Sequence, residues 1–203
     1  RNIYINSDSD LFGEVAARYG VKFHKRPPEL ATSQSMIDDY IYDFIRRTGA
    51  EFLAVVNPTS PFMSSHEFDQ AWLQFVKDDV DTQLCCQRIQ THCFLRGKPL
   101  NFSIQGKHPR SQDLEPILAL NFAITIWNAR KYVEQYEREG HGVYTGRLGF
   151  FVTEGASNID IDYEEDFQQA EFVARFLASG QEYPAEYDPV VRALIEKGVD
   201  TRT

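Results

Sequence analysis

Two aspartates, Asp160 and Asp162, alternate with Ile159 and Ile161 directly after an apolar stretch of the chain. In an extended strand alternate side chains share a face, so both carboxylates should point one way while both isoleucines face the core. Two oxygen ligands on one face can hold a divalent metal, above all Mg²⁺ that carries substrate phosphates. The stretch therefore predicts a site of metal-assisted phosphate chemistry.

The same stretch has a purely structural interpretation. Asp162 can be the N-cap of a helix that begins at Glu164, with Glu165 at the capping-box position. The two interpretations are compatible, because Asp162 lies at the junction between them. The pattern alone leaves both open.

Further candidate ligands follow predicted strands. Arg26 precedes two prolines and is a fork-shaped cation on a rigid loop, suited to phosphate or carboxylate. The loop 57–61 places Thr59 and Ser60 between two prolines, directly after an apolar run. Asn121 interrupts another apolar run, and a buried amide needs a partner, so Asn121 is a candidate ligand contact. A solvated arginine and a simple turn remain the structural alternatives.

Two other features have equally open interpretations. Asp8 follows the first strand at its carboxyl end, where ligands of α/β folds collect, although a turn or a helix N-cap explains it as well. The segment 91–116 is polar and lacks a sustained period, so it can be a solvated loop. In a chain of net charge −9 its basic cluster could instead serve an anionic substrate; the cluster comprises Arg96, Lys98, Lys107, His108 and Arg110.

These residues are carried by alternating strands and helices, which predict an α/β sandwich with a largely parallel sheet. The predicted strands cover 2–5, 21–24, 52–56, 82–88, 117–127 and 148–152. The predicted helices cover 11–19, 35–47, 64–76, 128–139 and 164–177.

Composition narrows the class of protein. The chain has 203 residues, 42% hydrophobic and 25% charged, which fits one domain, with at most a small appendage. Lys and Arg total 21 against 30 Asp and Glu, which argues against nucleic-acid or membrane-surface binding. Neither a transmembrane run nor a signal peptide is recognised, and three cysteines make neither a disulfide framework nor a zinc motif. A reducing, cytoplasmic location is expected.

Six short motifs follow one another at plausible spacing. They are Tyr4-Ile5-Asn6-Ser7-Asp8-Ser9, Arg26-Pro27-Pro28-Glu29-Leu30-Ala31, Asn57-Pro58-Thr59-Ser60-Pro61, Arg110-Ser111-Gln112-Asp113-Leu114, Asn121-Phe122-Ala123-Ile124 and Ile159-Asp160-Ile161-Asp162. Each motif is weak alone, but their order is specific. From Asn2 to about Leu177 the sequence resembles the acylneuraminate cytidylyltransferase family, the CMP-sialic acid synthetases and their relatives.

The resemblance implies a Rossmann-like, GT-A-like nucleotidyltransferase fold and transfer of CMP from CTP to the anomeric hydroxyl of a 2-keto-3-deoxy sugar acid, a sialic acid-like nonulosonate. It implies Mg²⁺ as cofactor, release of pyrophosphate, and a homodimer in which the segment after the central strands reaches the partner. The expected organisation is a domain over 1–177, whose sugar-side and dimerisation segment is 91–149, and a tail over 178–203 with a short helix.

The resemblance also implies roles for individual residues. The catalytic and metal-binding pair would be Asp160 and Asp162, with Asp8 as a further metal contact by likeness to the related Kdo enzymes. The nucleotide would contact Arg26, Ser35 and Asp8. The sugar substrate would contact Asn57, Thr59, Ser60, Arg110, Gln112 and Asn121, with Arg110 and Gln112 matching an Arg-Arg-Gln motif beside the sugar carboxylate.

Several departures from the family pattern keep alternatives open. The Gly-rich basic loop that cradles the triphosphate is not present, and we expect it upstream of Arg1. Asn57 replaces Gln, Ser111 replaces the second Arg, and Phe122 replaces Gly. These changes leave the sugar open. The alternatives are a related sugar nucleotidyltransferase that uses another nucleotide, and a degenerate, non-catalytic member that serves as a binding or dimerisation module.

Overall fold

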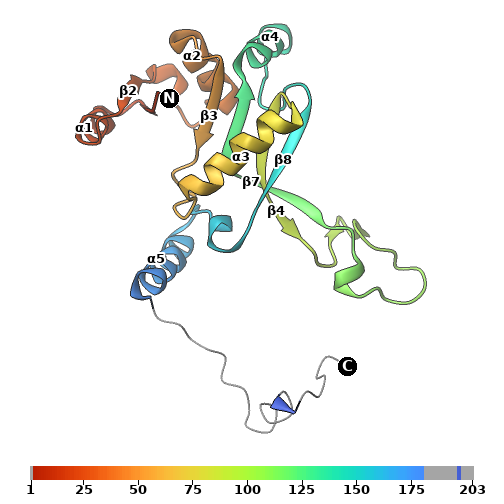
Figure 1. Ribbon diagram of the computed structural model, residues 1–203. Coiled ribbons are helices and arrows are strands. Elements are labelled where there is room, and N and C mark those ends of the chain that lie inside the picture. The colour runs from red at the N-terminus through yellow and green to blue at the C-terminus, as the bar shows by residue number, and fades with distance from the viewer. Residues whose placement is uncertain (1, 181–195, 198–203) are drawn as a thin grey trace. The chain divides into compact units, whose positions relative to one another are not determined.

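The computed structural model describes residues 2–180 and 196–197 (Figure 1). The chain divides into two compact units, Arg1–Asp162 and Tyr163–Thr203, and each is described by itself. The predicted domain boundary after residue 177 stays a prediction. The short helix predicted at about 190–197 lies almost entirely outside the described residues.

The first unit is built on a four-stranded sheet with the strand order β3-β7-β4-β8. The strands are β3 (Phe52–Val56), β7 (Ile117–Asn128), β4 (Thr82–Ile89) and β8 (Leu148–Thr153). β4 and β8 run parallel, while β7 runs antiparallel to both β3 and β4. The predicted α/β fold is confirmed, and three of the four strands share one direction; β7 makes the sheet mixed.

Helices pack on both faces of this sheet. Successive side chains of β7 point to opposite faces, so neighbouring residues of this strand contact different helices. The helices are α2 (Ile37–Thr48), α3 (Ser65–Asp78) and α4 (Ala129–Glu139). Trp127 is buried with Ile41 and Ile45 of α2 and Tyr132 of α4. Its neighbour Ile126 is buried on the other side with Ala71 and Phe75 of α3. The sheet is therefore the middle layer of a three-layer sandwich.

Helix ends follow the sequence signals. Ser64 and Glu67 form the capping box of α3: the backbone N–H of Ser64 donates to the Glu67 carboxylate (2.9 Å), and the N–H of Glu67 donates to Ser64 Oγ (3.2 Å). α2 and α4 end at Gly49 and Gly140, whose φ angles of 64° and 77° favour glycine. The predicted helix starting at 64–65 is confirmed.

The N-terminal part forms a separate two-stranded parallel sheet. Its elements are β1 (Tyr4–Ser7), α1 (Asp10–Arg18) and β2 (Lys22–Lys25). Phe44 of α2 packs edge-on against Tyr4 and His24, with ring centroids 5.3 and 5.0 Å away. Since Ile41 and Ile45 of the same helix belong to the central core, α2 joins the two sheets.

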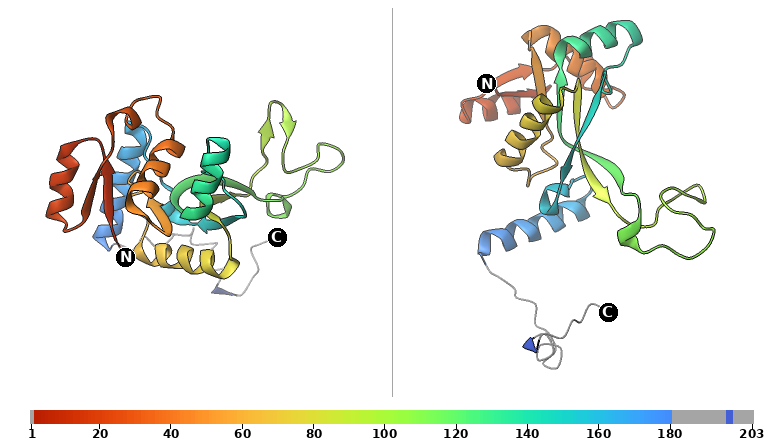
Figure 2. Two further views of the ribbon diagram at one scale, coloured as in Figure 1. Left: turned by 90° about the horizontal axis from the view of Figure 1, so that it is seen from above. Right: turned by 45° about the vertical axis from the view of Figure 1, so that its right-hand side comes forward.

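Residues 90–116, here called the arm, leave the sheet between β4 and β7 and project from the ends of these strands (Figure 2). The arm contains a short hairpin of β5 (Phe94–Leu95) and β6 (Lys98–Pro99). Stacked and edge-on rings hold it together; they belong to His92, Phe94, Phe102 and His108. The predicted loop therefore contains a partly exposed cluster of aromatic rings.

The second unit begins with α5 (Glu164–Ser179), whose N-cap is Tyr163. The backbone N–H of Tyr163 donates to Asp166 Oδ2 at 2.9 Å. The structural interpretation with Asp162 as N-cap and Glu165 as its partner is wrong by one residue, because Asp166 makes the returning hydrogen bond. Within the described residues, no helix has the length and apolar character needed to cross a bilayer.

Candidate active site

The loop after β3 is fixed to the neighbouring strand by its backbone. The N–H of Asn57 donates to the carbonyl of Ala123 on β7 (2.9 Å), and the N–H of Ser60 donates back to the carbonyl of Asn57 (3.1 Å). Pro58 and Pro61 restrict the backbone at both ends of the turn. The loop predicted from sequence is therefore a rigid platform at the carboxyl end of β3.

The acidic stretch docks on this platform. Thr59 Oγ1 donates to Asp160 Oδ1 at 2.5 Å, and the backbone N–H of Ile161 donates to the carbonyl of Thr59 at 2.9 Å. Asp160 is half-buried and Asp162 is exposed. Two predicted site motifs, about a hundred residues apart in sequence, therefore meet at Thr59.

The predicted strand at Ile159–Asp162 is wrong. After β8 the chain makes a 3-10 turn, η3 (Gly155–Asn158), and continues in irregular extended backbone up to α5. Both isoleucines are only half-buried. The reason is that this segment pairs with the turn around Thr59 rather than with a neighbouring strand.

A polar network lies beside the platform. Asn121 Nδ2 donates to Thr153 Oγ1 (2.7 Å), and Asn121 Oδ1 accepts the backbone N–H of Ala123 (3.2 Å). Thr153 Oγ1 lies 2.5 Å from Asn158 Oδ1 and 3.2 Å from the carbonyl oxygen of Cys86. Both ends of the Asn121 amide thus make hydrogen bonds inside the protein that hold the strand in shape, and its contact with a substrate stays a prediction.

That shape is a large bulge in β7. The register moves from Leu84↔Thr125 to Cys86↔Leu120, which leaves the residues between Leu120 and Thr125 opposite Cys85 alone. Phe122 inside the bulge has a φ of 53°, in the left-handed region that favours glycine. The bulge directs the carbonyl of Ala123 to Asn57 and so supports the platform.

The predicted nucleotide-side residues lie in and after the small sheet. Arg26 is half-buried; its Nε donates to Asn6 Oδ1 and its Nη2 to the Asn6 carbonyl, both at 3.2 Å, and it stacks on Tyr40. Ser35 Oγ accepts the backbone N–H of Thr32 (2.9 Å) and thereby closes the loop after Arg26. Asp8 is exposed at the carboxyl end of β1. Their roles toward a nucleotide stay predictions.

The predicted sugar-carboxylate residues lie on the arm. Arg110 Nε and Nη2 donate to the two carboxylate oxygens of Asp113 at 2.8 and 3.0 Å, and Gln112 is exposed. The hydrogen bonds from Arg110 lower the pKa of Asp113 and raise the pKa of Arg110 itself. The platform follows the carboxyl end of β3 and the arm follows the carboxyl end of β4; because these two strands run in the same direction, both segments lie toward the same end of the sheet.

The donor set suits a metal that also binds phosphate. Among residues 2–180 no three side chains of His, Cys, Asp or Glu come together as a metal cluster, so Asp8 does not complete a set with Asp160 and Asp162. Mg²⁺ typically takes one or two carboxylates and completes its shell with water and substrate phosphates. Asp160 and Asp162 fit that pattern, and Mg²⁺ itself stays a prediction.

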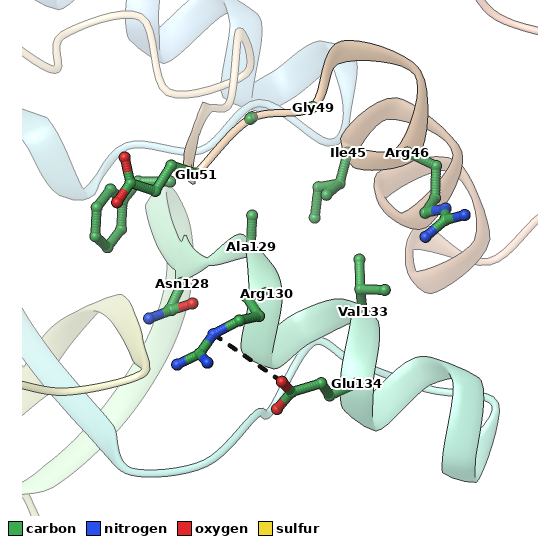
Figure 3. Close-up of a pocket in the computed structure, with 11 residues that line it drawn as sticks. Ile45, Arg46, Gly49, Glu51, Asn128, Ala129, Arg130, Val133 and Glu134 are labelled. Carbon is green, nitrogen blue, oxygen red and sulfur yellow. Dashed lines mark ion pairs between the residues drawn. The ribbon is translucent and has the colours of Figure 1, made fainter.

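One hollow of the described chain lies away from the predicted site. An open cavity of about 530 Å³ lies between the end of α2, the start of β3 and the start of α4 (Figure 3). Glu51, Phe52 and Asn128 line it, so it opens at the amino end of β3, whereas the platform follows the carboxyl end. None of the predicted site residues lines this cavity.

Sequence reasoning missed the residues that hold the site together, namely Asn6, Tyr40, Thr153 and Asn158. Thr153 ends a strand beside the acidic stretch, a position at which a polar side chain could have been noticed. Asn6 is a polar residue directly after Ile5 near the end of the first strand, a weaker signal. Tyr40 lies within the predicted helix 35–47, and its contact with Arg26 spans 14 residues that no local pattern connects.

Solved structures show to which fold the chain belongs. One is CMP:2-keto-3-deoxy-manno-octonic acid synthetase complexed with CTP, with a TM-score of 0.60 and 11% identity over 87% of this chain and 82% of that chain. Another is bifunctional IspDF from Campylobacter jejuni, with a TM-score of 0.58 and 11% identity over 83% of this chain and 42% of that chain. The chain therefore has the Rossmann-like fold of nucleotidyltransferases.

Sequence relatives narrow the class to a family. No family model matches. The chain is 34% identical over 182 residues to N-acylneuraminate cytidylyltransferase of Escherichia coli O18:K1:H7, and 26% identical over 175 residues to that of Streptococcus agalactiae serotype III. These alignments cover 83% and 82% of this chain and 41% of each relative, so the chain spans less than half of their length. The chain belongs to the acylneuraminate cytidylyltransferase family, as its motifs predicted.

Proposed function

We propose that this chain is the cytidylyltransferase part of an enzyme that transfers CMP from CTP to the anomeric hydroxyl of a 2-keto-3-deoxy sugar acid, a sialic acid-like nonulosonate, and releases pyrophosphate. The observation that carries the proposal is the junction of the platform with Asp160 through Thr59. It joins a predicted sugar-binding loop to a predicted metal ligand. The family of the chain supports the same reaction.

The reaction asks mainly for positioning and charge neutralisation. The sugar hydroxyl oxygen attacks the α-phosphorus, the new P–O bond forms, the bond to pyrophosphate breaks, and the hydroxyl proton leaves to solvent or to a nearby base. Mg²⁺, when bound, supplies positive charge for the phosphate oxygens. Thr59 holds Asp160 in one orientation for this task, and the backbone bond to Ile161 fixes the segment.

A buried hydroxyl next to this junction is available for a ligand. Ser60 is 4% exposed, and its Oγ has no hydrogen-bond partner within the described chain. An unsatisfied buried hydroxyl is costly. Its presence in the platform loop fits a side chain whose hydrogen bond is made when substrate binds. This supports the assignment of Ser60 to the substrate side.

The direct test is an assay of the full-length protein with CTP or UTP and a panel of sugar acids, in which CMP-sugar and pyrophosphate are both measured. We expect equimolar products with CTP and Mg²⁺, loss of turnover with EDTA, and turnover at least about 100-fold slower with UTP. Faster turnover with UTP would favour a related nucleotidyltransferase. CTP binding without any product would favour a non-catalytic module.

We further propose that the protein is a homodimer in which the arm of one subunit reaches the site of its partner. The arm projects from the sheet and carries exposed apolar side chains, including Phe94 and Ile104 at 57% and 65% exposure. Arg110 on the arm would then meet Asp160 of the other subunit. A closed, two-fold dimer would place two such sites symmetrically.

Mixed dimers test this arrangement. Asp160→Asn and Arg110→Ala chains should each be nearly inactive, but a heterodimer of the two contains one site with both wild-type residues. After equal mixing and subunit exchange, activity should recover to about a quarter of wild type, since half of the dimers carry one intact site of two. An absence of recovery despite exchange, or a monomer by sedimentation at high micromolar concentration, would contradict the proposal.

Arg110→Lys is expected to raise the KM for the sugar acid about 10- to 100-fold and to leave the KM for CTP unchanged. Arg110 already forms a two-pronged contact with the carboxylate of Asp113, and lysine offers only a point charge. The loss of one charge-assisted hydrogen bond gives this magnitude. Steady-state kinetics with each substrate varied in turn measures it.

Two variants of the arm serve as controls. The Asp113 carboxylate competes with the sugar carboxylate for Arg110. Asp113→Asn removes its charge and should therefore lower the KM for the sugar acid. Arg96→Lys changes an arginine on the same arm and should have no effect. If Arg110→Lys raises both KM values equally, Arg110 does not bind the sugar carboxylate.

A further inference from the structure

Arg26 is held on two sides by the protein. Its Nε and Nη2 donate to Asn6 Oδ1 and to the Asn6 carbonyl, each at 3.2 Å, and the guanidinium carbon lies 4.3 Å from the centre of the Tyr40 ring. The guanidinium has five N–H groups, and these contacts within the described chain use two of them. The remaining N–H groups on Nη1 and Nη2 are thus presented as one oriented edge.

The orientation of the Asn6 amide follows from its partner. Arg26 Nε can only donate, so the atom that faces it must be the amide oxygen. With Oδ1 fixed in this way, the Asn6 side chain acts as an acceptor at the end of β1. The backbone carbonyl of Asn6 accepts the second hydrogen bond from the guanidinium, so Asn6 alone fixes the plane of the Arg26 guanidinium.

His24 fixes Asn6 in turn. The two residues are register partners in the β1–β2 pair, and His24 Nδ1 lies 3.4 Å from Asn6 Oδ1. Because this oxygen is an acceptor, Nδ1 must carry the ring hydrogen. Burial lowers the pKa of His24, with Arg47 and Arg26 acting in the same direction and Asp43 opposing them, so the ring is neutral at pH 7 and donates from Nδ1.

The other side of the His24 ring has no competing hydrogen bond. Nε2 is buried without a hydrogen-bond partner in the described chain, and the nearest carboxylate oxygen, Asp43 Oδ2, lies 3.9 Å away. Phe44 packs edge-on against the ring. Among the described residues, the side-chain partner of the imidazole in hydrogen bonding is therefore Asn6.

We propose that Asn6 and His24 are positioning residues that hold the Arg26 guanidinium, on its Tyr40 platform, in the orientation that binds the nucleotide. This inference rests on the proposed function, in which Arg26 contacts CTP. It gives a role to an asparagine and to a half-buried histidine that the proposed reaction does not otherwise use. Neither residue touches the nucleotide in this proposal, and both act through Arg26.

The test is equilibrium binding of CTP to the full chain by calorimetry, together with steady-state kinetics. Asn6→Leu should weaken CTP binding about 10- to 100-fold, because the guanidinium loses a charged hydrogen bond and its orientation. Asn6→Asp keeps an acceptor for both donors and should stay within about threefold of wild type. The KM for the sugar acid should not change in either variant.

His24 is tested by a matched pair. His24→Asn keeps a side-chain N–H near the position of Nδ1 and should bind CTP nearly as wild type does, whereas His24→Leu should weaken binding about 5- to 20-fold. Asn2→Leu is the control for a merely structural effect, since Asn2 Oδ1 accepts only an exposed contact from Lys22 beside the same sheet. That variant should bind CTP unchanged.

A double-mutant cycle keeps the proposal testable even if Asn6→Leu is less stable. In an Arg26→Leu background, Asn6→Leu should cause no further loss of CTP affinity, because both changes remove one function. Additive losses would overturn the positioning role while leaving the proposed function intact. If the wild-type chain does not bind CTP at all, the proposed function and the positioning role both fail.

Discussion

Asp160→Asn is expected to reduce the turnover number about 100- to 1,000-fold while leaving the free energy of unfolding almost unchanged. In the proposed reaction the carboxylate would supply negative charge for Mg²⁺ at the phosphates, and removal of one preorganised electrostatic group typically has an effect of this size. Asparagine has the same shape and retains an oxygen that can accept the hydrogen bond from Thr59. Turnover at saturating CTP and sugar acid, with Mg²⁺ titrated, is the measurement.

Thr59→Val is the matched control, because it removes the hydrogen bond to Asp160 and keeps the charge. We expect a loss of only about 3- to 10-fold, which Mg²⁺ at higher concentration partly restores. If Asp160→Asn and the wild type have the same turnover and the same dependence on Mg²⁺, Asp160 is not a metal ligand. Its bond to Thr59 would then serve the fold alone.

Trp127→Ala is expected to lower the free energy of unfolding by about 3–5 kcal/mol, the usual cost of deleting a fully buried large aromatic side chain. Trp127 is 1% exposed, its ring packs edge-on against Tyr132 at 5.6 Å, and its indole N–H donates to the carbonyl of Val143 at 2.9 Å. The first unit should be destabilised as a whole, because this side chain joins the sheet to α2 and α4. Urea unfolding followed by far-ultraviolet circular dichroism measures it.

The second tryptophan provides the comparison. Trp72 lies on α3 at the other face of the sheet and is only partly buried, so Trp72→Ala should cost clearly less than Trp127→Ala. Trp127→Phe separates packing from hydrogen bonding and should cost about 1–2 kcal/mol. Equal losses for both alanine variants would show that the α2–α4 face does not dominate the stability of the unit.

The sequence predicted those parts of the fold that local patterns encode. The apolar run of β3, the helix that begins at 64–65, and the proline-bounded loop after Val56 all lie where they were expected. The direction of β7 could not be predicted in the same way. A continuous apolar strand shows that both of its faces are buried, but it carries no information on whether its neighbours run parallel or antiparallel to it.

The sequence predicted individual residues of the candidate site, but only some of the contacts between them. Thr59 and Asp160 were each candidates, and the structure joins them directly. Asn121 was expected to need a partner and has one, but that partner is Thr153, 32 residues further along the chain. No local spacing encodes such a pairing, because it depends on β7 and β8 both flanking β4. The salt bridge of Arg110 with Asp113 is local and could have been foreseen.

The late position of β7 in the chain has a consequence for synthesis on the ribosome. β7 lies between β3 and β4 in the sheet, yet both of those strands emerge first, and the other neighbour of β4, β8, emerges later still. A nascent chain that ends before Asn128 therefore presents two apolar strands with incomplete edges, which are templates for association with other chains. This sheet closes late in translation, so the edges of β3 and β4 that will pair with β7 stay open until β7 has emerged.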